Sequence, residues 1–167
     1  LKKMNFREKI GWVCESIAGS ATVGRGKTII EDLRLKDRWS DIRMPLFMMS
    51  YKNSREFKYF TERVRLDSEV KNTKLDFKTL WYFVPSLQGN DLIASLSGKI
   101  GGYVTDFELE DMHVIAAERG FSGTLSGRVS GLPEVDKMTI DVRLSRFLLT
   151  TEGLDGFIRE WAPDMRF

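Results

Sequence analysis

The sequence has few of the residues on which most catalytic and metal sites depend. Its 167 residues include one cysteine, Cys14, and one histidine, His113. A single cysteine excludes a disulfide framework and the paired spacings of zinc sites, and Cys14 is predicted to be a small buried hydrophobe. Any Ser-His-Asp scheme would have to use His113, which lies on the polar side of an alternating segment with no nucleophile-elbow motif nearby. The sequence therefore predicts a protein that is not an enzyme and has no metal or cofactor.

The sequence also has little net charge and no long apolar run. The 26 Lys and Arg residues nearly balance the 24 Asp and Glu residues, and the two signs are interleaved along the chain. This pattern argues against a nucleic-acid partner. The longest apolar run, near Pro45 to Met49, is far shorter than the ~20 residues of a membrane-spanning helix. The sequence begins with Leu1 and shows no signal peptide, so we expect residues 1–167 to be a single piece of a longer protein whose membrane anchor lies in segments absent here.

Two further patterns suggest chemistry that the local context does not support. Residues 24–28 read Gly-Arg-Gly-Lys-Thr, but Ala21 stands where a phosphate loop needs its first glycine, and a strand pattern follows Thr28 where that loop needs a helix. A hairpin turn is predicted instead. The adjacent acids Glu31-Asp32 and Glu110-Asp111 face opposite sides of a strand, so they cannot flank one substrate bond.

Between Leu92 and Phe147 the sequence alternates between apolar and polar residues, as β-strands do. Every second residue is apolar or small, and the register slips at Glu110-Asp111 as at a β-bulge. Four antiparallel strands separated by turns are predicted, with one apolar face and one face of Ser, Thr and charged residues. Glycines on the apolar face indicate a sheet that curls tightly or leaves space above itself. These glycines are Gly98, Gly102, Gly123 and Gly127.

The rest of the chain shows the same alternation of apolar and polar residues, interrupted by short predicted helices. Strands are predicted over 27–36, over 42–51 with an edge or bulge at Pro45, and over 65–77. Helices are predicted near 54–65, with Ser54 as N-cap, near 78–86 and near 151–162. The alternation of strands and short helices forms a weak internal repeat. The predicted fold class is therefore mainly β with short helices, an antiparallel meander curled into a groove.

Several segments together resemble a known family. These are Leu-Ser-Gly-Lys-Ile-Gly-Gly at 96–102, Phe-Glu-Leu at 107–109, Met-x-Val at 112–114, the run Phe-Ser-Gly-Thr-Leu-Ser-Gly-Arg-Val-Ser-Gly-Leu-Pro at 121–133, and the strand-to-helix junction at 145–157. In order and spacing they resemble the AsmA-like superfamily, and within it the TamB-type translocation and assembly module proteins, in particular their Bacteroidetes-like versions. The resemblance covers residues 29–161.

The resemblance implies a β-taco or repeated β-groove in the periplasm that is anchored in the inner membrane by a helix. Such proteins are implicated in moving phospholipid between the inner and outer membranes and in outer-membrane biogenesis, with an outer-membrane barrel of the TamA type as partner. The family has no catalytic residues, and its functional positions are the apolar ones that face the groove. In this sequence the matching positions are Leu96, Ile100, Val104, Leu109, Met112, Val114, Phe121, Leu125, Val129, Ile140, Val142 and Leu144.

The residues leave other interpretations open. One is a protein-interaction module in which an exposed strand edge pairs with unfolded strands of outer-membrane barrels. Another is a closed structural α+β domain whose apolar face is covered by the short helices. A lipid conduit predicts damage from Leu125→Asp or Ile140→Asp, whereas a strand-pairing module predicts damage from proline on an edge strand.

Overall fold

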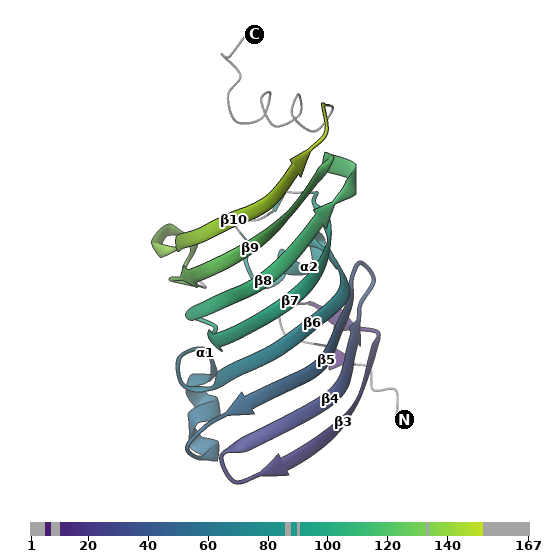
Figure 1. The fold of residues 1–167 in the computed structure, drawn as a ribbon. Coiled ribbons are helices and arrows are strands. Elements are labelled where there is room, and N and C mark those ends of the chain that lie inside the picture. Colours follow the sequence, from purple (N-terminus) through teal and green to yellow (C-terminus); the bar gives the residue numbers. More distant parts are fainter. Residues whose placement is uncertain (1–5, 8–10, 86–87, 90, 133, 152–167) are drawn as a thin grey trace.

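The computed structural model describes residues 6–7, 11–85, 88–89, 91–132 and 134–151. Within them the chain is mainly β, with one antiparallel sheet of eight strands that does not close on itself (Figure 1). This confirms the predicted fold class. The eight strands are β3 (Ser16–Gly24), β4 (Lys27–Lys36), β5 (Asp41–Ser50), β6 (Arg65–Asp76), β7 (Ile93–Tyr103), β8 (Asp106–Ala116), β9 (Phe121–Ser130) and β10 (Thr139–Leu149).

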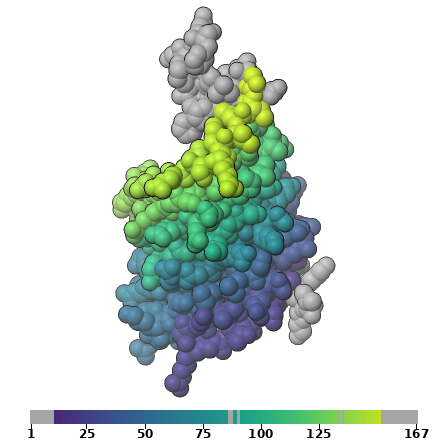
Figure 2. Space-filling model, in the orientation of Figure 1, coloured from purple at the N-terminus to yellow at the C-terminus, as the bar shows by residue number. Residues whose placement is uncertain are grey.

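The strands pair strictly in chain order, so the sheet is an uninterrupted meander from β3 to β10. In the space-filling view the colour changes gradually from purple to yellow across the molecule, in chain order (Figure 2). Gly24 pairs with Lys27, which confirms the predicted hairpin turn at 24–28. A separate two-stranded pair, β1 (Phe6–Arg7) and β2 (Val13–Cys14), precedes the sheet. Cys14 is buried there, as expected.

The helical segments between strands are short. The 3₁₀ segment η1 (Ser54–Tyr59) and α1 (Phe60–Arg63) join β5 to β6, and α2 (Phe77–Leu80) joins β6 to β7. Short 3₁₀ turns, η3 (Ala117–Arg119) and η4 (Val135–Lys137), follow β8 and precede β10. The helix predicted near 151–162 lies outside the described residues except at its first position.

Two details of the predicted helices were wrong. The N-cap of η1 is Asn53, whose side chain accepts from the backbone N–H of Arg55, and not Ser54. The predicted helix near 78–86 is shorter and begins one residue earlier, because the Asp76 carboxylate caps its first turn by accepting from the N–H of Lys78. Asn and Asp at the residue before a helix satisfy N–H groups that have no partner inside the helix.

A bulge recurs in every second strand and bends the sheet. Four non-glycine residues have φ between 46° and 51°: Asp32 in β4, Asn72 in β6, Asp111 in β8 and Arg146 in β10. The register shifts beside each of them, including at the predicted position Glu110-Asp111. A bulge bends its strand and increases the local twist. Four bulges in alternate strands therefore curve the sheet along a line that crosses all of them.

Hydroxyl groups on the neighbouring strand support two of these bulges. The backbone N–H of Asn72 donates to Ser97 Oγ at 2.9 Å, and that of Asp111 donates to Ser126 Oγ at 3.0 Å. A backbone N–H that leaves the strand ladder needs another acceptor. Each serine supplies one, so the extra residue is accommodated without an unsatisfied donor at these two positions.

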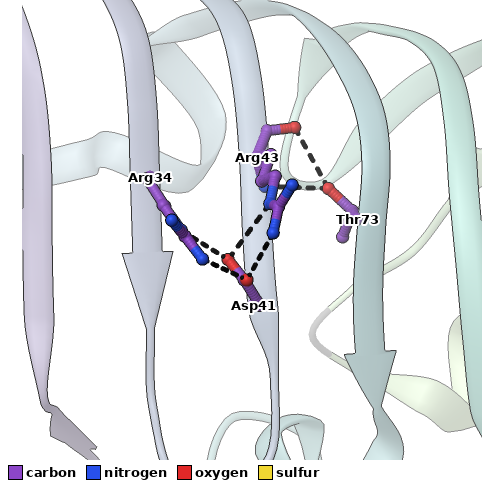
Figure 3. Close-up of polar contacts among 4 residues, drawn as sticks. All are labelled: Arg34, Asp41, Arg43 and Thr73. Carbon is purple, nitrogen blue, oxygen red and sulfur yellow. Dashed lines mark hydrogen bonds and ion pairs between the residues drawn. The ribbon is translucent and has the colours of Figure 1, made fainter.

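Pro45 lies in the middle of the sheet, where its missing N–H interrupts the ladder between β5 and β6. Of the two predicted alternatives, an edge and a bulge, the edge is excluded because β5 pairs on both sides. The hydroxyl of Thr73 bridges part of the interruption. It accepts from the backbone N–H of Arg43 at 2.9 Å and donates to the carbonyl of the same residue at 3.0 Å (Figure 3).

A buried polar cluster ties one end of the sheet to α2 and to the segment before β2. The Asp37 carboxylate accepts from Trp12 Nε1, Thr79 Oγ1 and the backbone N–H groups of Trp39 and Ser40, at 2.6 to 2.8 Å. Asp37 and Thr79 are almost completely buried. A buried carboxylate requires this number of donors, because removing it from water is otherwise costly.

Candidate functional site: an apolar sheet face

The strand register collects nearly all of the predicted groove residues on one side of the sheet. Residues directly opposite one another across an antiparallel ladder share a face. The pairs Leu96 with Val114, Ile100 with Leu109, and Met112 with Leu125 connect three strands. Further pairs extend this face to β10: Val129 lies opposite Ile140, Leu125 opposite Leu144, and Gly127 opposite Val142. Phe121 lies on the same face, opposite Ala116.

Val104 is the exception. It lies in the turn between Tyr103, the last residue of β7, and Asp106, the first of β8, so it faces no strand. The two-residue turn of Val and Thr gives no glycine or proline signal, so the alternation in the sequence continues past the end of the strand. The structure therefore removes Val104 from the set of face residues.

The same face continues over the first four strands, which the sequence-based prediction did not include. Ile30 of β4 pairs with Ala21 of β3 and with Phe47 of β5, and Met49 pairs with Leu66 of β6. The helices between these strands interrupt the sequence pattern, so alternation alone does not join them to the meander. We call the whole surface the apolar face. Its members in the first four strands are Ile17, Ala21 and Val23, Thr28, Ile30, Leu33 and Leu35, Ile42, Met44, Phe47 and Met49, and Leu66, Ser68, Val70, Thr73 and Leu75.

On the apolar face, buried side chains lie on interior strands, and the side chains of the two edge strands are mostly exposed. Leu33, Val70 and Met112 are buried. At the edges large side chains are open to solvent: Val23 of β3 is 74% exposed, and Ile140 of β10 is 56% exposed. Exposed apolar groups that continue a buried apolar surface are typical of a binding surface.

The two helices of the described residues flank the apolar face at opposite ends of β6. Tyr51 joins the η1 segment to this side, since its hydroxyl bonds Thr28 Oγ1 at 2.9 Å and its ring contacts Phe57. At the other strand ends, Thr79 of α2 bonds Ser40 Oγ at 2.7 Å. Each α-helix has four residues, about 6 Å of length, whereas eight strands span about 34 Å. These helices border the apolar face and are too short to cover all of it.

The opposite face is polar and held by ion pairs. The Arg34 guanidinium bonds Asp41 at 2.6 Å, and Arg43 bonds the same carboxylate at 2.9 Å (Figure 3). These two arginines, Arg34 first, hold the pKa of Asp41 well below its usual value, against a smaller opposing effect of burial. Arg128 likewise lowers the pKa of Asp106. The polar face stays charged at neutral pH, which makes it the side that water favours.

His113 lies on the polar face, as predicted. It pairs with Ser97 and Thr124, and a ring nitrogen lies 3.4 Å from Thr124 Oγ1. Within the ranges that the structure describes, no group of three His, Cys, Asp or Glu side chains is arranged to hold a metal ion. In the same ranges no helix is both long and apolar enough to cross a membrane.

Comparison with known proteins adds no relative to this description. No protein-family model matches the chain, and neither a curated protein nor a solved structure matches it. The class defined by the structure is thus an open antiparallel β-meander with one apolar and one charged face.

Proposed function

We propose that the apolar face binds acyl chains, and that the chain is a section of a TamB-type β-groove that conducts phospholipid between the inner and outer membranes in the periplasm. The observation that carries this proposal is the continuity of the apolar face over eight strands, ending in exposed large side chains at both edges. The resemblance of residues 29–161 to that family agrees with it. The inner-membrane anchor and the TamA-type barrel partner belong to the same proposal.

An acyl chain needs no specific polar contact to lie on such a surface. Each CH₂ group removed from water contributes about 0.8 kcal/mol wherever it is placed. A surface that is apolar along its whole length therefore lets a chain slide between equivalent positions. The expected selectivity is for hydrocarbon and not for a particular headgroup, which suits transport better than storage.

The test is lipid retention measured by native mass spectrometry after incubation with phosphatidylethanolamine and phosphatidylglycerol vesicles. Leu144→Asp is expected to reduce bound phospholipid about tenfold or more, because it places a charge on the apolar face where an acyl chain would lie. Leu144 is 44% exposed in the free protein, so this change should not unfold the chain.

The matched control is Ile115→Asp. Ile115 is 41% exposed but lies on the polar face, opposite Ser95 and Ser122. Lipid retention should be unchanged in this variant. Equal retention in both variants, with both folded by circular dichroism, would show that the apolar face is not where lipid binds.

A second candidate function is strand addition to an unfolded barrel strand. The observation in its favour is that β3 and β10 each pair on one side only within the described residues. An edge strand of this length presents a row of backbone donors and acceptors to an incoming chain. Proline at the outward-facing positions of β10 would abolish this activity and leave lipid retention intact.

A further inference from the structure

The two edges of the sheet are complementary to each other. We propose that β10 of one copy pairs antiparallel with β3 of a second copy, which extends the sheet head to tail. The proposal is independent of lipid binding and rests on the geometry of the edges. Its first support is strand direction: seven successive antiparallel pairings separate β3 from β10, so a second copy in the same orientation presents an antiparallel strand.

The interior of the sheet already contains a template for this contact. Asn72 forms the bulge of β6, and the neighbouring strand β7 places Gly98 opposite Val70 beside that bulge. Gly98 also lies beside the bulge of β8 at Asp111, where an added Cβ atom would meet Met112 Cα at 2.6 Å. A bulged strand therefore fits beside a regular strand that has glycine at this one position.

The two edges repeat both halves of this template. β10 carries its own bulge at Arg146, and β3 is regular with Gly19 beside the bulge of β4. Superposing Arg146 on Asn72 and Gly19 on Gly98 fixes the register between the copies. Leu144 then lies opposite Gly19, as Val70 lies opposite Gly98.

In this register the apolar-face residues from Ile140 to Phe147 meet apolar-face residues of β3. Val142 faces Ala21, Phe147 faces Ile17, and Ile140 faces Val23. Leu144 and Val142 of β10 meet the small residues Gly19 and Ala21 of β3, which avoids overpacking at the centre of the contact. Ile140 and Val23, 56% and 74% exposed in the single chain, would cover each other.

Charge does not oppose the contact. The sequence of β3, Ser-Ile-Ala-Gly-Ser-Ala-Thr-Val-Gly, has no ionisable side chain, so Asp141 and Arg143 on the polar face of β10 meet only neutral groups. Natural sheets protect edges with proline, lysine or inward-pointing charge. Neither edge strand has proline or lysine within its bounds. The bulge at Arg146 is not protective in this fold, because the same bulge at Asn72 and Asp111 is paired on both sides.

The test is sedimentation velocity of the delipidated chain over a wide range of concentration. A head-to-tail contact is heterologous and does not close, so the mass should rise beyond a dimer as concentration increases. Val23→Lys and Ile140→Asp are each expected to weaken association about tenfold or more. An equimolar mixture of the two variants should associate again, because one interface then pairs Asp with Lys and the other is unchanged.

Three results would overturn the proposal. A chain that stays monomeric at all concentrations has no such contact. Loss of association in Ile140→Asp but not in Val23→Lys would indicate symmetric pairing of two β10 strands. A mixture that fails to associate would show that the two edges do not meet. Lipid retention is read by mass spectrometry and not by sedimentation, so failure of either proposal leaves the other measurable.

Discussion

Asp37→Ala is expected to lower the free energy of unfolding by about 3 kcal/mol. The substitution leaves the indole N–H of Trp12, the Thr79 hydroxyl and two backbone N–H groups without their acceptor in a buried site. Each buried donor without a partner costs about 1–3 kcal/mol, and water entering the vacated space restores part of the loss. Urea denaturation with tryptophan fluorescence measures the change.

The control is Glu118→Ala, which removes an exposed acid from the η3 turn. A surface change of this kind should alter stability by less than about 0.5 kcal/mol. If Asp37→Ala were as mild as the control, the polar cluster would not be what ties α2 and the segment before β2 to the sheet.

Gly98→Ala is expected to lower the free energy of unfolding by about 2–3 kcal/mol. The added Cβ would lie 2.6 Å from Met112 Cα and 2.8 Å from the Asp111 carbonyl oxygen, both backbone atoms of the bulged strand. Backbone cannot move aside as a flexible side chain does, so β7 and β8 would have to separate. Chemical denaturation followed by circular dichroism gives the value.

Gly101→Ala on the same strand is the matched control. Its Cβ would meet only the ends of flexible side chains, Asp67 Oδ1 at 2.9 Å and Arg65 Nη2 at 3.4 Å. The expected cost is below about 1 kcal/mol. Equal effects at the two glycines would mean that close approach beside the bulge is not the reason for Gly98.

The sheet could be predicted from the sequence because alternation is a local signal. One face is apolar and the other charged, so every strand from Lys27 onward carries its own period of two. The bulge at Glu110-Asp111 was visible for the same reason, since Leu109 and Met112 must share a face. The other three bulges follow the same pattern of a face residue, one intervening residue, the residue of positive φ and a second face residue: Ile-Glu-Asp-Leu at 30–33, Val-Lys-Asn-Thr at 70–73 and Leu-Ser-Arg-Phe at 144–147.

The contacts that join distant segments could not be predicted in this way. The Asp37 cluster joins residues 25 and 42 positions apart, and nothing in the local pattern marks Asp37 as buried. The extent of the apolar face was also missed in β3 to β6, where α1 and α2 separate strands that are neighbours in the sheet. The error at Val104 has the opposite cause, because an apolar turn residue continued the alternation by chance.

We propose that hydrocarbon lies on the apolar face of the sheet. The most direct test is photo-crosslinking with a benzophenone amino acid placed at Leu144 on the apolar face or at Leu148 on the polar face of the same strand, in the presence of phospholipid vesicles. Leu148 is the more exposed of the two side chains, at 71% against 44%, so exposure alone favours it. We expect phospholipid adducts at position 144 and few or none at position 148; equal labelling, or labelling mainly at 148, would show that hydrocarbon does not lie on the apolar face.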